Sequence, residues 1–211
     1  MSFAEELELV LPQDLPHRDK LIVTAARHLE LIAEANEYMN LTRITSEREA
    51  AIKHVLDSVL PWCLFEGAGT ILDAGSGAGF PGIPMAVVLP ESRFILSESI
   101  QKKARFLESA VAALGLTNVE VSAQRAEDLL KSRRVDIITA RAMAPLNRAL
   151  GLFAPGLRNG ARALLYKGPD VETEIAEAAS EGKKRKVIMR VIERYELPDA
   201  LGTRTIVHLS T

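Results

Sequence analysis

The sequence has a single cysteine, no long apolar run and no large excess of either charge, and each shortage excludes a class of protein. With Cys63 alone, neither an intrachain disulfide nor a cysteine-based zinc site can form, which fits a reducing compartment. No stretch reaches the roughly 18 to 20 continuous apolar residues that a membrane helix needs. The acidic N-terminus also lacks the basic start of a signal peptide. We therefore expect a cytoplasmic protein with no membrane partner and no metal.

The formal net charge is only -2, which argues against a protein that coats nucleic acid with its whole surface. Such binding depends on clustered Lys and Arg side chains that contact phosphates, so we expect no DNA partner. Two local basic runs remain. A solvated surface is the favoured interpretation of each, namely Lys102, Lys103 and Arg105, and the run from Lys183 to Lys186.

What the chain does have is enough apolar sequence for one sizeable core, with 211 residues of which 47% are hydrophobic. Residues 18–39 carry apolar side chains at helical spacing. Ser46 followed by Glu49 predicts a capping box that starts a second helix, which ends before Pro61. We expect residues 1–66 to form an N-terminal helical extension packed on the core and residues 67–211 to form the main domain.

From Thr70 onward, short β-rich runs alternate with helical stretches. This alternation predicts a parallel sheet with helices on both faces. The expected strands span residues 70–73, 93–98, 119–122, 135–139 and 161–166, and the expected helices lie near Met85 and over residues 100–114, 127–130 and 146–157. Residues 187–197 and 204–209 are two more strands, and their short connection predicts an antiparallel hairpin. A mostly parallel, seven-stranded α/β sheet that ends in such a hairpin resembles the Rossmann-like fold of class I methyltransferases.

A glycine-rich segment, residues 71–82, runs from the first strand into a helix. It does not fit the dinucleotide pattern G-x-G-x-x-G, because counting from Gly75 puts Phe80 at the third glycine. A phosphate-binding P-loop also fails, because Ile83 and Pro84 stand where Lys and Ser or Thr are needed.

The remaining pattern is Asp-x-Gly-x-Gly-x-Gly, which begins at Asp73 and includes Gly75 and Gly77. It is the form in which methyltransferases hold the amino-acid part of S-adenosylmethionine (SAM). A purely structural strand-to-helix turn is the alternative, and the loop alone leaves the two equal. Glu98 favours the cofactor, because a carboxylate about 20 residues beyond such a loop accepts hydrogen bonds from ribose hydroxyls. Glu127 follows the third strand at the same edge of the sheet, where a plain helix start is the alternative.

The chain lacks the residues that methyltransferases use on unreactive atoms. Cys63 lies in the extension, where a small buried residue is expected rather than a nucleophile. After Thr139 the sequence Ala-Arg-Ala-Met-Ala-Pro contains no Asn- or Asp-Pro-Pro-aromatic motif for exocyclic amines. The acceptor should therefore already be nucleophilic, such as a ring nitrogen. If it is guanine N7, no Arg can grip N7 and O6 together, and recognition must use other edges or stacking.

Seven stretches of the chain together resemble the ribosomal RNA small subunit methyltransferase G family, also called glucose-inhibited division protein B. They are, in order, NEYMNLT (36–42), KHVLDS (53–58), ILDAGSGAGFPGIP (71–84), KKARFL (102–107), RAE (125–127), TARA (139–142) and KG (167–168). The resemblance implies a class I enzyme that methylates N7 of guanosine 527, in the 530 loop of 16S ribosomal RNA, with SAM as cofactor. It also implies cofactor contacts from Gly75, Phe80, Ala126, Glu127 and Arg141. Glu98 departs from the Asp that many members carry.

The residue that performs catalysis is not identified by the sequence, but three side chains are candidates on the substrate side. Arg141 and Lys167 end the fourth and fifth strands, although either could instead pair with Glu127. His54 and Asp57 share a helical face and could touch a flipped-out base, although a polar network that fixes the extension to the sheet is favoured.

Two other functions remain open at this point. One is methylation of a small molecule, which would need an enclosing lid. The other is SAM binding without catalysis, in ribosome assembly or sensing. The partner is expected to be 16S ribosomal RNA or the small ribosomal subunit, and the sequence does not distinguish naked RNA from an assembled particle. The oligomeric state is equally open.

Overall fold

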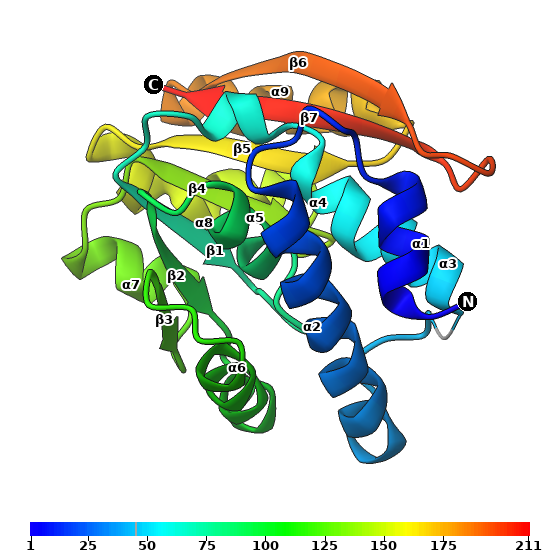
Figure 1. Ribbon diagram of the computed structural model, residues 1–211. Coiled ribbons are helices and arrows are strands. Elements are labelled where there is room, and N and C mark those ends of the chain that lie inside the picture. The colour runs from blue at the N-terminus through cyan, green and yellow to red at the C-terminus, as the bar shows by residue number, and fades with distance from the viewer. Residues whose placement is uncertain (45) are drawn as a thin grey trace.

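The computed structural model describes residues 1–44 and 46–211 and shows a twisted sheet between two layers of helices (Figure 1). Over these residues the sheet has seven strands in the order β3-β2-β1-β4-β5-β7-β6. The strands are β1 (Thr70–Ala74), β2 (Arg93–Ser97), β3 (Val119–Ser122), β4 (Ile137–Arg141), β5 (Arg162–Lys167), β6 (Ile188–Glu196) and β7 (Thr203–Ser210). The first five are parallel, and β7 pairs antiparallel with both β5 and β6. The fold prediction is confirmed, with strand ends displaced by at most two residues.

The helices of the main domain match the expected ones, with one addition. They are α5 (Gly82–Val88), α6 (Gln101–Ala113), α7 (Ala126–Ser132), α8 (Leu146–Arg158) and α9 (Val171–Arg185). The sequence did not indicate α9, because the residues that this helix buries are Val171, Ala178 and Gly182, and two of these three are too small to give a clear apolar stripe.

The N-terminal extension differs more from the prediction. It contains α1 (Phe3–Val10), α2 (Arg18–Met39), α3 (Glu47–Ala50), η1 (Ala51–Leu56), α4 (Asp57–Val59) and η2 (Trp62–Phe65). The helix over residues 18–39 is confirmed, but α1 was not expected, although Ser2 and Glu5 form a capping box at its start. The second predicted helix is interrupted by η1, a π-helical segment. Ser46 does accept a hydrogen bond from the Glu49 amide (3.2 Å), while the Glu49 carboxylate pairs with Lys53.

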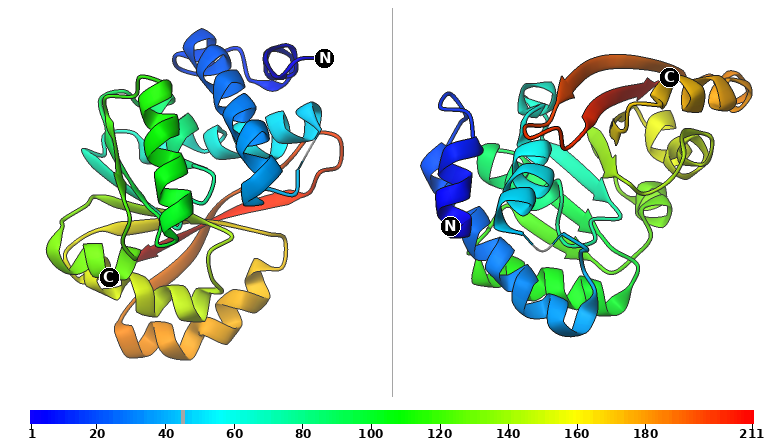
Figure 2. Two further views of the ribbon diagram at one scale, coloured as in Figure 1. Left: turned by 90° about the horizontal axis from the view of Figure 1, so that it is seen from below. Right: turned by 90° about the vertical axis from the view of Figure 1, so that its right-hand side faces the viewer.

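The two helical layers cover opposite faces of the sheet. Helices α7, α8 and α9 cover one face of the sheet, where Ile138 of β4 and Phe153 of α8 belong to one hydrophobic cluster. The other face packs on α5, α6 and the extension, so that Leu21 and Ile52 share a hydrophobic cluster with Phe94. Figure 2 shows the blue N-terminal helices and the yellow to orange α8 and α9 on opposite sides of the strands. The extension therefore completes the core of the main domain.

Cys63 corrects one expectation, because it is exposed rather than buried. It lies in η2, a short turn whose buried residue is Phe65, so the turn directs the cysteine side chain outward. In the described ranges no helix is long and apolar enough to cross a membrane.

Candidate active site

The glycine-rich loop follows β1 and leads into α5, as the sequence indicates. Gly75 has φ +71°, and a Cβ atom there would lie 3.0 Å from Cγ of Met143. A side chain at Gly82 would lie 2.2 Å from Leu96 Cδ2 and 2.8 Å from Asp73 Oδ2. Both positions thus require glycine, the first because it has a left-handed backbone and little room and the second because α5 packs closely on the sheet.

Asp73 lies fully buried beneath this loop. Its Oδ2 atom accepts a hydrogen bond from the Gly82 amide (3.0 Å), whereas Oδ1 has no partner within residues 1–44 and 46–211. Burial raises the pKa of the carboxyl to about 6. An acceptor in this position suits a ligand that brings its own donor, and the ammonium group of SAM is such a donor.

Glu98 follows β2 and is also buried. Its two oxygens accept hydrogen bonds from the amides of Ile100 (2.8 Å) and Gly77 (3.2 Å). The carboxylate thereby ties the glycine-rich loop to the start of α6. Each oxygen keeps a second lone pair, so the same group can still accept from ribose hydroxyls.

A groove of about 260 Å³, the cofactor groove hereafter, brings several predicted cofactor residues together. It is lined by Gly75, Glu98, Ala126 and Glu127, and by Met143, which lies against Gly75. Glu127 Oε1 lies 3.7 Å from Arg125 Nη1, which is a loose ion pair. Four residues from three separate loops thus meet at the carboxyl edge of the sheet, where ligands of such folds bind.

Four predicted cofactor residues do not line the cofactor groove, namely Asp73 and Gly77 of the loop, Phe80 and Arg141. The Phe80 ring is buried between His28 and His54, with centroid distances of 4.8 and 4.6 Å, and is stacked on His54. Arg141 lies near the same ring, at 5.4 Å, and turns toward the extension. Contacts from these two residues to a cofactor stay a prediction, and for Phe80 they would have to come from its main chain.

A second cavity, of about 730 Å³ and called the acceptor cavity below, opens at the carboxyl ends of β4 and β5. It brings together all three substrate-side candidates, His54, Arg141 and Lys167. The acceptor cavity and the cofactor groove share Met143 and Ala144 in their linings. A group bound in one can therefore lie against a group bound in the other.

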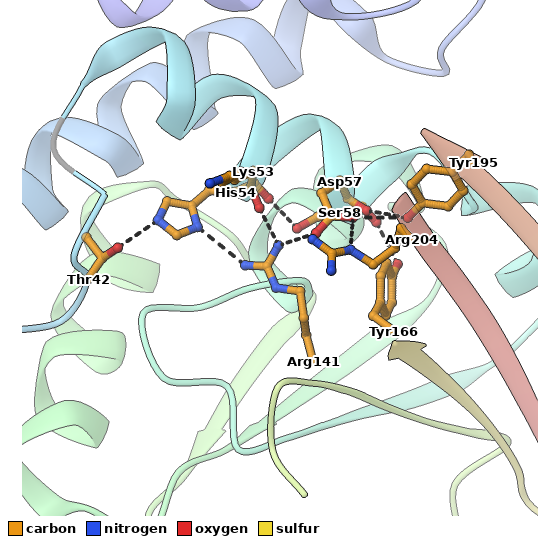
Figure 3. A network of polar contacts seen from close by, with 9 residues as sticks. All are labelled: Thr42, Lys53, His54, Asp57, Ser58, Arg141, Tyr166, Tyr195 and Arg204. Atoms are coloured by element: carbon orange, nitrogen blue, oxygen red, sulfur yellow. Dashed lines mark hydrogen bonds and ion pairs between the residues drawn. The ribbon is translucent and has the colours of Figure 1, made fainter. Parts of the chain in front are cut away.

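Asp57 is the centre of a network of polar contacts at the edge of this cavity (Figure 3). Its buried carboxylate accepts from Arg141 Nη1 (3.1 Å), Arg204 Nε (2.9 Å) and the Tyr195 hydroxyl (3.2 Å). Arg141 also donates to the Lys53 carbonyl (2.7 Å). These contacts join the extension to β4, β6 and β7, which supports the hypothesis of a polar network that fixes the extension.

The suggested pairing of Arg141 or Lys167 with Glu127 is wrong. Arg141 is bound to Asp57, and the Lys167 ammonium contacts Glu174 (2.7 Å) and the Ala144 carbonyl (2.7 Å). The reason is topological, because β4 and β5 direct these side chains toward the acceptor cavity, while Glu127 lines the cofactor groove.

His54 is buried, and its Nε2 atom lies 3.0 Å from the Thr42 hydroxyl. Its Nδ1 atom lies 3.5 Å from Arg141 Nη2. Burial, together with the charge of Arg141, lowers the pKa of His54 to about 3. At neutral pH the ring is therefore uncharged, in contact with Arg141 and stacked on Phe80.

Comparison with known proteins agrees with this geometry. The family model for rRNA small subunit methyltransferase G matches residues 22–201. The chain belongs to this family. A relative in Solibacter usitatus, named ribosomal RNA small subunit methyltransferase G, is 69% identical over 209 residues, covering 99% of this chain and 100% of that protein. A relative of the same name in Sorangium cellulosum is 41% identical over 179 residues, covering 82% and 75%.

Solved structures support the fold alone. Cofactor-bound Rv0187 from MTB aligns with a TM-score of 0.59 at 15% identity, over 89% of this chain and 88% of that one. A precorrin-6y C5,15-methyltransferase from Geobacter metallireducens aligns with a TM-score of 0.56 at 12% identity, over 73% and 87%. The methyltransferase G family and the class I fold, both expected from the sequence, are thereby confirmed.

The structure of this methyltransferase G family member also adds site residues that the sequence did not single out. Arg204, Tyr195 and Glu174 all come from segments after residue 168. The only available signal was their polar character within a hairpin and a helix, and that pattern is equally typical of a solvated surface.

Proposed function

We propose that this protein transfers a methyl group from SAM to N7 of guanosine 527 in 16S ribosomal RNA. The observation that carries the proposal is the pair of adjoining sites, the cofactor groove and the acceptor cavity, which share Met143 and Ala144. The name of the 69% identical relative, ribosomal RNA small subunit methyltransferase G, supports the class of substrate.

The residues in and beneath the cofactor groove fit SAM. Asp73 lies fully buried beneath the glycine-rich loop, next to the groove lining, and its Oδ1 atom, which has no partner among the described residues, would accept from the ammonium group of the cofactor. Glu98 would accept hydrogen bonds from the ribose hydroxyls, and Gly75 lets the ligand approach the main chain. When bound, SAM supplies an electrophilic methyl group.

The acceptor cavity fits an atom that needs no deprotonation. N7 of guanine has a free lone pair, so the protein has to hold the base with N7 toward the cofactor groove and keep other groups away from it. The neutral His54 and the Arg141 that is fixed on Asp57 are suited to shaping and orienting the site. Methylation leaves the guanine ring with a positive charge, and carboxylates that line the cavity, such as Glu174, would stabilise that charge.

We also propose that the extension, residues 1–66, packs on the methyltransferase domain, residues 67–211, and that the two form one compact domain. Supporting it, Asp57 and His54 of the extension line the acceptor cavity together with Arg141 of the main domain. We further infer that the enzyme works in the cytoplasm on 16S ribosomal RNA or on the small subunit.

The test is transfer of tritiated methyl groups from SAM to small subunits purified from cells that lack the enzyme. Label at guanosine 527 of 16S RNA is the expected result, and subunits from cells that contain the enzyme, already methylated, should take up none. Label confined to small metabolites would instead indicate a small-molecule methyltransferase. Binding of SAM without any transfer would indicate an assembly or sensing protein.

A further inference from the structure

We propose that Lys167 and Glu174 together recognise the Watson-Crick edge of the target guanine, which makes them specificity-determining residues of the acceptor cavity. This inference rests on the proposed function and adds which side chains select guanine over other bases. Lys167 ends β5 and Glu174 lies on α9, and both line the acceptor cavity.

The chemistry of the reaction restricts which edge of guanine can be read. N7 must keep its lone pair for the methyl group, so the usual grip of an Arg on N7 and O6 is excluded. The remaining polar edge presents the O6 acceptor and two donors, N1-H and the N2 amino group. A site that reads this edge needs one donor for O6 and at least one strong acceptor for the two N-H groups.

The ion pair of Lys167 and Glu174 supplies that combination in a fixed arrangement. Glu174 Oε2 accepts from Lys167 Nζ (2.7 Å) and from the Leu146 amide (3.0 Å). Within the described residues Oε1 of Glu174 has no hydrogen-bond partner. Lys167 gives a second N-H to the Ala144 carbonyl (2.7 Å) and so keeps a third N-H, since an ammonium group has three. The pair thus offers one donor and one acceptor side by side.

The other carboxylates around the cavity are less suited to this role. Asp57 is fully buried and already accepts from Arg141, Arg204 and Tyr195. Glu177 lies on the exposed side of α9 and is not held by an ion pair in the part of the chain that the structure describes. Glu174 is half-buried and anchored at one oxygen, so binding a base costs it little additional freedom.

Adenine would be rejected by the same pair. Its Watson-Crick edge presents an amino group where guanine has O6, and a bare N1 acceptor where guanine has N1-H. Lys167 would then face a donor, and Glu174 would face an acceptor. Both contacts would be repulsive, and unmade contacts of charged groups are costly in a site away from water.

The experiment measures kcat/KM for methylation of reconstituted small subunits that carry either guanosine or inosine at the target position. Inosine lacks only the N2 amino group. We expect the wild-type protein to prefer guanosine by on the order of 10- to 100-fold, the usual effect of a lost hydrogen bond to a charged group.

Glu174→Gln should remove this preference. The amide oxygen of Gln would be drawn to Lys167 and the Leu146 amide, so its NH₂ group would face the N-H groups of the base. Methylation of guanosine should fall at least tenfold and the ratio of guanosine to inosine should approach one, while SAM affinity stays unchanged and the melting temperature falls, because Lys167 loses its counter-charge. Glu172→Gln, on the exposed side of the same helix, should behave as wild type.

If Glu174→Gln keeps the wild-type preference, or if the wild-type protein does not distinguish the two bases, the inference is wrong. Should Glu174→Gln fail to fold, Glu174→Asp decides the matter, because a shortened carboxylate should lower the preference and an unchanged preference contradicts the inference. No methylation of guanosine by the wild-type protein would instead overturn the proposed function itself.

Discussion

At the scale of single residues, the acceptor cavity depends on one buried carboxylate. Asp57 holds two arginines from the two strands that flank β5, Arg141 of β4 and Arg204 of β7. A buried ion pair of this kind contributes little net stability when intact, but loss of one partner leaves uncompensated charge in the interior. Because Asp57 belongs to the extension, the position of the Arg141 side chain depends on how the extension packs on the main domain.

Replacement of Asp57 by Asn should destabilise the protein by about 3 to 5 kcal/mol, because two guanidinium groups lose their counter-charge. Urea unfolding followed by circular dichroism measures the change. Asp199→Asn is the matched control, since Asp199 pairs with Arg48 at an exposed site and should cost under about 1 kcal/mol. Equal effects of the two variants would contradict the central role of Asp57.

Replacement of Glu98 by Ala should weaken SAM binding by about 1 to 3 kcal/mol, because charged hydrogen bonds to the ribose are lost. Titration calorimetry gives the affinity, and Glu91→Ala, on an exposed turn outside the cofactor groove, serves as the control. An unchanged SAM affinity of Glu98→Ala would contradict the prediction that this carboxylate binds the ribose. The loop amide of Gly77 also loses its acceptor in this variant, so part of the effect comes from the loop.

At the scale of elements, α2 and η1 each contact the glycine-rich loop through a buried histidine. His28 on α2 contacts the Ala78 carbonyl (2.8 Å), and His54 on η1 stacks on Phe80. Burial lowers the pKa of His28 to about 4 and that of His54 to about 3. Both rings are thus neutral in the folded protein and easily protonated in the unfolded chain.

These shifts predict that stability falls as the pH falls from about 6.5 to 4. In that range the unfolded chain binds about two more protons at the histidines, whose unfolded pKa is 6.5, than the folded protein does. Asp73 acts in the opposite direction, because its pKa is raised to about 6 and the folded state binds that proton first. These three groups give a net difference of about one proton and a loss of about 1.4 kcal/mol per pH unit, and His208, whose pKa burial also lowers, adds to the loss.

Urea unfolding at pH 7, 6 and 5 tests this slope, with His54→Gln as the comparison. Removing His54 leaves His28 and Asp73 nearly balanced, so the slope of the variant should be much smaller over the same range, with His208 supplying what remains. A wild-type protein whose stability rises on acidification would show that the histidines are not held neutral.

The sequence could predict the local elements of the fold but not the contacts between distant elements. Strands and loops such as residues 71–82 were predictable because apolar alternation and glycine spacing are local properties. By contrast, the contact of Asp57 with Arg204 joins residues 147 positions apart, and no local pattern encodes it. Helix α9 was missed because it buries small residues, and Glu174 was missed with it.

At the scale of the whole molecule, the extension and the main domain share one hydrophobic cluster. Leu7, Leu21 and Ile52 of the extension are fully buried in the same cluster as Ile71 and Phe94 of the sheet. Residues 67–211 by themselves would keep α5 and α6 on this face but expose the part that the extension covers. We therefore expect the two segments to fold as one unit rather than as two independent ones.

A chain truncated to residues 67–211 should lack a cooperative thermal transition, because the part of the hydrophobic cluster that the extension covers becomes exposed. Thermal unfolding followed by circular dichroism tests this. The intact chain with the exposed substitution Val23→Ala is the control and should melt as wild type does. A truncated chain that melts cooperatively near the wild-type temperature would show that the main domain folds without the extension.

We propose that the cofactor groove and the acceptor cavity form one continuous active site, because both are lined by Met143 and Ala144. A crystal structure of the protein with bound SAM is the most direct test. We expect the ribose against Glu98, the ammonium group near Asp73 and the sulfonium methyl group directed past Met143 toward Lys167 and Glu174. SAM bound elsewhere, or with its methyl group turned away from the acceptor cavity, would contradict it.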